Sequence, residues 1–270
     1  MSESELPIGI FDSGVGGLTV FRAIERRLPN ESLIYLGDTA RIPYGIRSPS
    51  TVHRYAFEDA AFIKAKRVKA IAIACNTASA LASEDLAREY SIPVLGVIEP
   101  GSRRAVRLTS VGRIGVIGTE ATIASHAYEK AMFSIRSGLD IISRACPLLV
   151  PLAEEGWLNH PVTQQVVEEY LQDLKEAAVD TLVLGCTHYP ILRPVIDQVM
   201  GNSVRFVDSG EAVADELAEM LESNQLLKRG AGRRSEQFYV TDSASRFKRV
   251  AELFLGRPID HLETVELGAL

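Results

Sequence analysis

The 270-residue sequence has only three cysteines and no apolar run that approaches the ~18 residues of a membrane span. Three cysteines in a chain of this size do not make a disulfide scaffold, and they are typical of thiols in a reducing compartment. The segment 1–5 is polar and acidic, and it lacks the basic region and apolar stretch of an export signal. We therefore expect a cytoplasmic protein that does not enter a membrane.

A surplus of positive charge is also missing. The chain has 29 Lys and Arg residues against 35 Asp and Glu residues, a formal net charge of −6. This balance argues against a nucleic acid partner, which is usually bound by a basic surface. The apolar fraction of 46% and the charged fraction of 24% are ordinary for a globular protein, and the length suffices for one large domain or two smaller ones.

Short apolar runs alternate with amphipathic segments along most of the chain, which is typical of βαβ units with parallel sheets. The runs that we interpret as strands are 8–11, 33–36, 70–74, 94–98, 114–117, 140–143, 181–184, 205–207 and 237–240. Helical patterns cover 51–66, 78–90, 162–178 and 211–223. The segment 226–235 is rich in basic residues and glycine, and we interpret it as a loop.

Two distant parts of the chain carry nearly the same pattern. Segments 71–77 and 182–188 are each an apolar run that ends in a cysteine followed by small polar residues. Segments 8–14 and 114–120 also match, and each precedes its cysteine by a similar distance. We interpret this repeat as two similar α/β domains with largely parallel sheets, related by a pseudo-twofold axis, with the active site in the cleft between them. Residues 1–98 plus 208–270 would form the first domain, and residues 99–207 the second.

Cys75 and Cys186 each follow a predicted buried strand, at the edge where open α/β sheets bind their ligands. Two thiols that face each other across one substrate could act as base and acid on opposite faces of one carbon. We expect a helix to begin after each cysteine, and its N-terminus would lower the pKa of the thiol. Cys146 has no counterpart in the repeat and is interpreted as a buried structural residue.

Small polar residues follow both cysteines. Asn76, Thr77 and Thr187 supply neutral hydrogen-bond donors, which suit a carboxylate or a developing enolate. His188 alternates in side-chain direction with Thr187 and could reach the same cavity. We therefore include the histidine among the candidate functional residues.

The glycine-rich segment 12–17 follows the first predicted strand. Its spacing fits neither G-x-G-x-x-G nor the P-loop pattern. One interpretation is a tight turn between strand and helix. We favour an anion site, in which backbone N–H groups bind a carboxylate and Asp12 has a more specific role.

Other kinds of site could use the same residues. A zinc site would take Cys75, Cys186 and His188 as ligands, but C-x₂₋₄-C spacing and an evident fourth ligand are missing. A redox dithiol would need C-x-x-C, and a papain-like Cys–His pair would leave one cysteine unused. Pyridoxal phosphate needs a Schiff-base lysine, and no lysine lies in these motifs. We therefore expect neither a metal nor an organic cofactor.

Taken together, the motifs resemble those of glutamate racemases in the cofactor-independent aspartate/glutamate racemase family. The resemblance covers essentially the whole chain, and the matching segments are 11–17 (FDSGVGG), 42–45 (IPYG), 74–78 (ACNTA), 185–190 (GCTHYP) and 238–243 (FYVTDS). Relatives of the aspartate and hydantoin type tend to carry glutamate where this chain has His188, so the histidine favours the glutamate enzymes.

By this resemblance, the chain interconverts L- and D-glutamate without a cofactor and supplies D-glutamate to peptidoglycan synthesis. Cys75 and Cys186 would form the catalytic pair. Asp12 would assist Cys75, while His188 and Glu154 would assist Cys186, although the adjacent Glu155 fits the pattern almost as well. The residues expected to contact the substrate are Asp12, Ser13, Tyr44, Gly45, Asn76, Thr77, Thr187 and His188. We also expect a homodimer.

Two other functions stay open at this point. One is a related racemase that acts on aspartate or another amino acid, against which His188 argues. The other is a non-enzymatic protein that binds an amino acid or a protein partner, such as a gyrase inhibitor, which the paired thiols disfavour.

Overall fold

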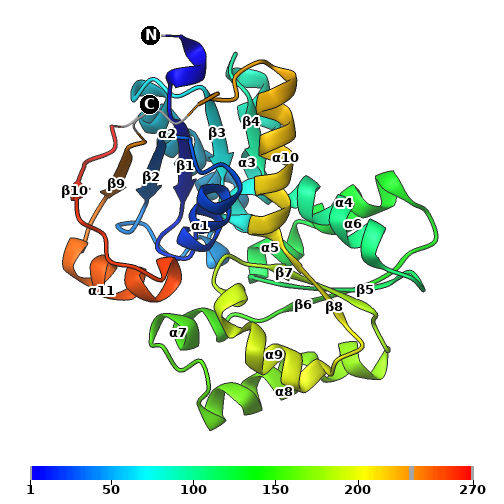
Figure 1. Cartoon of the computed structure of the whole chain (residues 1–270). Coiled ribbons are helices and arrows are strands. Elements are labelled where there is room, and N and C mark those ends of the chain that lie inside the picture. The colour runs from blue at the N-terminus through cyan, green and yellow to red at the C-terminus, as the bar shows by residue number, and fades with distance from the viewer. Residues whose placement is uncertain (1, 231–233, 269–270) are drawn as a thin grey trace.

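The computed structural model describes residues 2–230 and 234–268, which form two sheets of parallel strands (Figure 1). The first sheet has the order β10–β9–β2–β1–β3–β4, with bounds Ile8–Asp12 (β1), Leu33–Gly37 (β2), Ala70–Ile73 (β3), Val94–Gly96 (β4), Glu236–Val240 (β9) and Leu262–Thr264 (β10). The second has the order β6–β5–β7–β8, with bounds Arg113–Gly118 (β5), Asp140–Ala145 (β6), Thr181–Gly185 (β7) and Arg205–Asp208 (β8).

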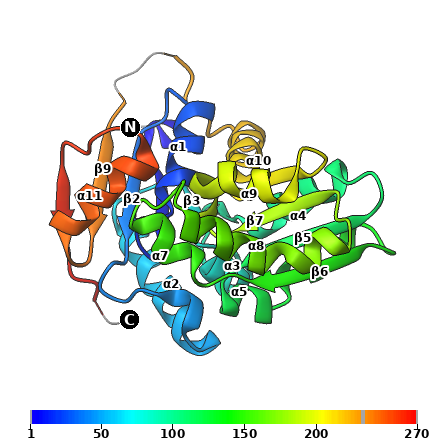
Figure 2. The ribbon, with the colours of Figure 1, turned by 90° about the horizontal axis from the view of Figure 1, so that it is seen from below.

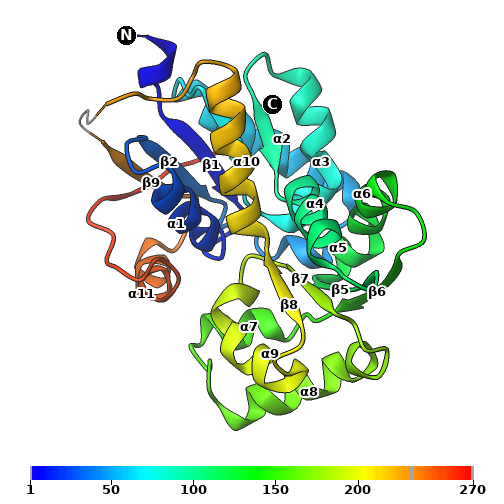
Figure 3. The same ribbon diagram turned by 45° about the vertical axis from the view of Figure 1, so that its right-hand side comes forward.

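Helices cover both faces of each sheet (Figures 2 and 3). On the first sheet, α2 (Pro49–Ala65) and α3 (Asn76–Glu89) lie opposite α1 (Leu18–Arg27), α10 (Ser209–Ser223) and α11 (Ala244–Leu255). On the second, α4 (Ile98–Leu108), α5 (Glu120–Ala124) and α6 (Ala127–Ile135) lie opposite α7 (Leu149–Glu154), α8 (Pro161–Glu176) and α9 (Arg193–Met200). No helix in the described part of the chain is long and apolar enough to cross a membrane.

Burial on both faces explains why the strands are almost continuously apolar. In β3, Ala70 and Ala72 pack in the core beneath α1 and α10, whereas Ile71 and Ile73 pack in the core beneath α2 and α3. A strand with polar residues on alternate positions would expose them to one of these cores.

The predicted fold class is confirmed, and the repeat is visible in the topology. The order β2–β1–β3–β4 in the first sheet is the order β6–β5–β7–β8 in the second. All nine predicted strands are present, with ends that differ by at most two residues. The predicted set lacks β10, whose three residues are partly or fully exposed and carry no apolar pattern. The described residues of the predicted loop 226–235 form no helix or strand, and 231–233 lie outside the described residues.

The chain passes between the sheets twice, and a helix follows each passage. Helix α4 follows β4 but packs on α6 and on β7 of the second sheet, and α10 follows β8 but packs on α1 of the first. These two helices also pack against each other and are joined by ion pairs of Arg103 with Glu216 and of Arg104 with Glu211. The helices α4 and α10 therefore join the two halves of the structure at the points where the chain passes from one sheet to the other.

Gly9 in β1 and Gly115 in β5 are equivalent in the repeat, and each lets a helix approach its sheet. A Cβ atom would lie 2.2 Å from Ile63 Cγ2 at Gly9, and 2.6 Å from Leu174 Cδ2 at Gly115. We expect Gly9→Ala and Gly115→Ala each to lower the free energy of unfolding by about 1–3 kcal/mol, because the added methyl group overpacks a closed core. Urea unfolding followed by circular dichroism measures the loss.

The control for this experiment is Gly268→Ala, since a Cβ atom at Gly268 would meet nothing within 4 Å. We expect its stability to stay within experimental error of the unmodified protein. Wild-type stability in both core variants would show that α2 and α8 can shift without cost, and the packing explanation would be wrong.

Candidate active site

A cavity of about 300 Å³ lies between the two sheets, at the carboxyl ends of β1, β3, β5 and β7. This is the edge at which parallel α/β sheets bind ligands. Ten of the eleven predicted site residues line it, and Asp12 is the one that is absent from the lining. The lining residues are Ser13, Gly14, Ile42, Pro43, Tyr44, Gly45, Ile46, Cys75, Asn76, Thr77, Thr119, Glu120, Pro147, Val150, Pro151, Glu154, Cys186, Thr187 and His188.

Cys75 caps the N-terminus of α3 directly after β3. Its Sγ accepts a hydrogen bond from the backbone N–H of Ala78 at 3.5 Å and lies 3.6 Å from the hydroxyl of Ser13. Burial, together with the nearby charge of Asp12, raises the pKa of the Cys75 thiol to about 12. The expectation that the helix N-terminus lowers this pKa is therefore wrong, because burial and a neighbouring carboxylate outweigh the helix.

The glycine-rich turn binds the Asp12 side chain. The N–H of Gly14 donates to Asp12 Oδ2 at 2.9 Å. Burial raises the pKa of Asp12, although His188 and the backbone N–H groups of the turn act in the opposite direction. The predicted anion site is thus occupied by the protein's own carboxylate. Oxygen Oδ1 of Asp12 is buried and has no partner among the described residues.

Two glycines of this turn are required by close contacts. A Cβ atom at Gly17 would lie 2.4 Å from Asp12 Cβ, and one at Gly16 would lie 2.4 Å from His188 Nδ1. Gly16 therefore allows the turn of the first sheet to meet the histidine that follows the second cysteine.

Cys186 follows β7 and belongs to a chain of polar contacts. Nδ1 of His188 lies 3.8 Å from Cys186 Sγ, and Nε2 lies 3.1 Å from Glu154 Oε1. Burial alone would lower the pKa of His188, but Cys186 and Glu154 raise it to about 10. The bond to His188 in turn lowers the pKa of Glu154, despite the burial of the carboxylate. This arrangement keeps an imidazolium between a sulfur atom and a carboxylate at neutral pH.

Two expectations about this second unit are resolved by the geometry. Glu154, and not the exposed Glu155, is the glutamate that contacts His188. The helix expected directly after Cys186 is a short 3₁₀ turn, Tyr189–Leu192, followed by α9. A long helix dipole therefore does not act directly on Cys186, and His188 is the positive group beside it.

Neutral side chains join the two halves of the cavity. Thr77 Oγ1 lies 2.9 Å from Thr119 Oγ1 across the cleft. Asn76 Nδ2 donates to the hydroxyl of Tyr128 at 2.8 Å, and Asn76 Oδ1 is buried without a partner among the described residues. The hydroxyl of Thr19 donates to the carbonyl oxygen of Thr187 at 2.9 Å, which joins α1 to the turn after Cys186.

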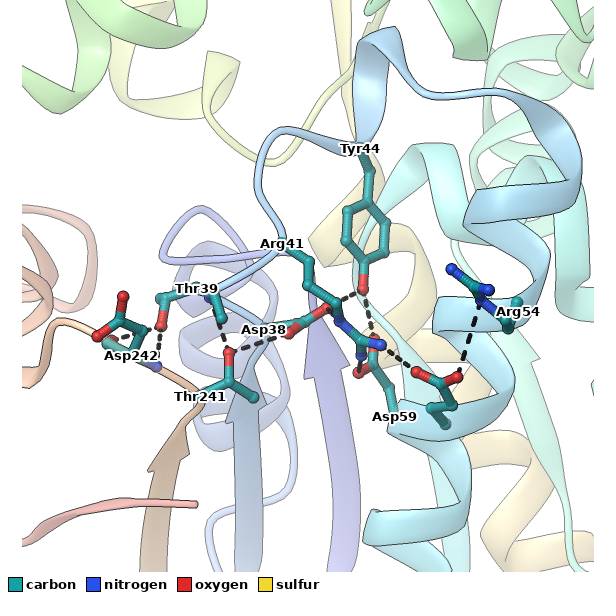
Figure 4. A network of polar contacts seen from close by, with 10 residues as sticks. Asp38, Thr39, Arg41, Tyr44, Arg54, Asp59, Thr241 and Asp242 are labelled. Atoms are coloured by element: carbon teal, nitrogen blue, oxygen red, sulfur yellow. Dashed lines mark hydrogen bonds and ion pairs between the residues drawn. The ribbon is translucent and has the colours of Figure 1, made fainter. Parts of the chain in front are cut away.

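The loop that carries Tyr44 and Gly45 forms one side of the cavity. The hydroxyl of Tyr44 is bound to Asp38 and Asp59 (Figure 4), and neither of these aspartates lines the cavity. Gly45 has no space for a side chain, since a Cβ atom would lie 2.6 Å from Thr119 Cβ. At these two residues the loop can meet a ligand mainly through its backbone.

Sequence reasoning missed Thr119, which lines the cavity and caps α5. The repeat contained the signal: Thr119 stands in segment 114–120 where Ser13 stands in segment 8–14. Cys146 is buried in a hydrophobic core away from the cavity lining, in agreement with a structural role. No group of three or more His, Cys, Asp and Glu residues in 2–230 or 234–268 is arranged to hold a metal ion.

Comparison with known proteins gives consistent results. The Asp/Glu/hydantoin racemase family model matches residues 8–217. A glutamate racemase from Geobacter metallireducens is 51% identical over 262 residues and covers 97% of each chain. The crystal structure of a glutamate racemase from Bacillus anthracis has a TM-score of 0.94 at 42% identity and covers 98% of each chain. The structure of the Francisella tularensis glutamate racemase in complex with D-glutamate has a TM-score of 0.92 at 38% identity, and covers 99% of this chain and 100% of its own. The chain therefore belongs to the Asp/Glu/hydantoin racemase family, as one of its glutamate racemases.

Proposed function

We propose that the cavity inverts glutamate at its α-carbon by a two-thiol mechanism, with Cys75 and Cys186 on opposite faces of the substrate. The α-proton of an amino acid is weakly acidic, so one thiolate removes it while the opposite thiol delivers a proton to the other face. The observation that carries this proposal is that both cysteines, from equivalent strands of two sheets, line one cavity. The D-glutamate formed would enter peptidoglycan synthesis.

The surroundings of the two sulfur atoms differ, which supports different roles for the two cysteines. The raised pKa of Cys75 favours a neutral thiol, which can donate a proton. His188 keeps its proton at neutral pH, and its imidazolium lies beside Cys186. The sulfur atom of Cys186 thus lies beside a cation, and that of Cys75 near a carboxylate. Asp12 on one side, and His188 with Glu154 on the other, would assist these transfers.

The unpaired buried atoms support a ligand that brings both a cation and an anion. Asp12 Oδ1 and Asn76 Oδ1 are acceptors without partners among the described residues, and a substrate ammonium group would satisfy them. Ser13, Thr77 and Thr187, with the backbone of Tyr44 and Gly45, can donate to the carboxylates. These donors are neutral, so they stabilise negative charge without supplying a proton that quenches a thiolate.

We further propose the domain bounds, the oligomeric state, the cellular location and the ligand of the enzyme. The strand order supports domains formed by residues 1–98 plus 208–270 and by residues 99–207. The resemblance supports a homodimer, and the sequence supports a cytoplasmic location. The D-glutamate complex of the Francisella tularensis relative supports glutamate as the small-molecule ligand.

We expect either pure enantiomer of glutamate to lose its ellipticity until it reaches zero when incubated with the enzyme. The decay needs no added cofactor and continues in the presence of a chelator, because the two thiols supply the whole acid–base chemistry. Circular dichroism measures it directly. Strict dependence on pyridoxal phosphate or zinc would contradict the mechanism.

In the same assay, kcat/KM for glutamate is expected to exceed kcat/KM for aspartate by at least about tenfold. Equal values for the two amino acids would favour a broader amino-acid racemase.

Glu154→Gln tests the polar contacts that join Cys186, His188 and Glu154. His188 holds its proton up to a pKa of about 10 partly because of the negative charge of Glu154. Removing that charge lowers the pKa of His188, so the alkaline fall of kcat/KM is expected to begin about one pH unit lower. A pH profile of kcat/KM measures the shift. The matched control is Glu155→Gln, whose exposed side chain should leave the profile unchanged. A shift in the control with none in Glu154→Gln would exchange the roles of the two glutamates.

Cys75→Ala and Cys186→Ala separate the two thiols. The equilibrium constant of racemisation is one, so kcat/KM has to be equal in both directions for every variant and cannot assign the faces. Exchange of the α-proton with deuterated solvent can, because removal and return on one face need only one thiol. By the family resemblance, Cys75 serves D-glutamate and Cys186 serves L-glutamate. We expect Cys186→Ala to exchange the α-proton of D-glutamate only, and Cys75→Ala to exchange the α-proton of L-glutamate only. Inversion should be nearly abolished in both variants.

NMR of the α-proton measures this exchange, and circular dichroism measures inversion in the same samples. The reversed pattern would exchange the assignment of the faces. Near-normal inversion by either variant would end the two-thiol mechanism.

A further inference from the structure

The loop 38–47, which follows β2 and walls the cavity, is held by a buried polar network that the two-thiol mechanism does not use (Figure 4). Asp38 and Asp59 are fully buried, and Tyr44 is 1% exposed. Arg41 donates from Nε to Asp38 Oδ2 at 2.5 Å and from Nη2 to Asp59 Oδ1 at 3.0 Å. Two buried acidic side chains, one from the loop and one from α2, thus share the partly exposed guanidinium of Arg41 and the buried phenol of Tyr44.

The number of hydrogen-bond donors in this network indicates which of its acidic groups carries a proton. The hydroxyl oxygen of Tyr44 contacts Asp38 Oδ2 and lies 2.9 Å from Asp59 Oδ2, but a phenol has only one hydrogen to donate. Asp38 also accepts from Arg41 and, through Oδ1, from the hydroxyl of Thr241 at 2.9 Å, which is the pattern of a carboxylate. Tyr44 therefore donates to Asp38, and Asp59 has to supply the hydrogen of the other contact.

The charges around Asp59 agree with a neutral acid at this position. Burial and the neighbouring charge of Asp38 raise the pKa of Asp59 well above its usual range, and Arg41 only partly opposes them. Glu58, on the same helix, also contacts Arg41 and adds a further negative charge. With Asp59 neutral, one arginine faces two carboxylates instead of three.

The same network fixes the position of the cavity wall. Asp38 donates its backbone N–H to the carbonyl oxygen of Asp12 at 2.9 Å, at the end of the strand that leads into the glycine turn. Thr241 Oγ1 also accepts from the N–H of Ala40 at 2.8 Å, which joins the loop to the end of β9. The loop is therefore anchored on three sides: on β1, on α2 through Asp59, and on the segment after β9.

We propose that Asp38, Arg41 and Asp59 are positioning residues for substrate binding, which hold the Tyr44 side chain so that the backbone of Tyr44 and Gly45 meets the substrate in one fixed position. This rests on the proposed function, because it takes the cavity as the glutamate site. Both cysteines lie outside the network. Its loss therefore changes how well glutamate is bound, while the proton transfers between bound glutamate and the thiols keep their rate.

Tyr44→Phe is the variant that tests the network with the least disturbance, because it removes only the hydroxyl and keeps the buried ring. We expect KM for L- and D-glutamate to rise about fivefold to tenfold, with kcat within about twofold of the wild-type value, as for the loss of a contact equal in ground and transition states. Asp38→Asn should raise KM more than about tenfold, because it removes the carboxylate that accepts from three donors.

Asp59→Asn tests the location of the proton. An asparagine side chain keeps a carbonyl oxygen for Arg41 and an N–H donor for the Tyr44 oxygen, so it resembles the protonated acid. We expect its KM to rise less than about threefold, well below the effect of Asp38→Asn. Equal, large increases in both aspartate variants would show that Asp59 is ionised and would overturn the assignment of the proton.

Arg54→Ala is the matched control on α2. Arg54 is exposed and lies 3.9 Å from Glu58, at the edge of the network, so its loss should leave KM and kcat unchanged. Thermal unfolding of each variant separates misfolding from altered binding. Should Asp38→Asn fail to fold, Tyr44→Phe decides. A folded Tyr44→Phe enzyme with wild-type KM would overturn the positioning role, whether or not its kcat is reduced. An inactive wild-type enzyme would instead contradict the proposed function.

Discussion

The presence of both thiols in one cavity depends on how the two sheets meet. Cys75 follows β3 and Cys186 follows β7, and these strands hold the same place in sheets of the same order. Open parallel sheets bind ligands at the carboxyl ends of their strands. When two such edges meet, they form one site that is approached from two sides, which is the geometry that inversion at a single carbon requires. The glycine turn and the loop 38–47 pack around this shared edge.

The repeat places unlike residues at equivalent positions of this edge. Asp12 stands where the second half has Gly118, and His188 stands where the first half has Thr77. A carboxylate therefore lies near one sulfur atom and an imidazolium near the other. Two closely coupled thiols share protons as a pair, and unequal surroundings decide which member of the pair holds the proton. The scaffold is duplicated, but the residues beside the two thiols are not.

The sequence was informative where local pattern decides the structure. Apolar runs identified nine strands, and the repeated cysteine motifs identified the edge where the cavity lies. It could not reveal that the hydroxyl of Tyr44 is directed into a network with Asp38 and Asp59, because those contacts join residues of a loop and a helix whose distance is set by packing. It also misjudged the pKa of Cys75. A helix N-terminus can be read from local sequence, whereas complete burial beside Asp12 is a property of the folded chain.

The division of the site between the sheets bears on how the enzyme excludes water. Cys75 and the anchored loop belong to the first sheet, while Cys186, His188 and Glu154 belong to the second. Helix α11, which packs on the first sheet, contacts this second unit: Arg246 Nη2 lies 3.2 Å from Glu154 Oε2, and the ring of Phe254 packs edge-on against His188. A change in the angle between the sheets would leave each thiol with its own partners but would separate the thiols, break the α11 contacts and admit water to the imidazolium. The proximity of the thiols and the burial of His188 and Glu154 are thus consequences of the same arrangement of the two sheets, and a ligand that contacted both sheets would stabilise both features.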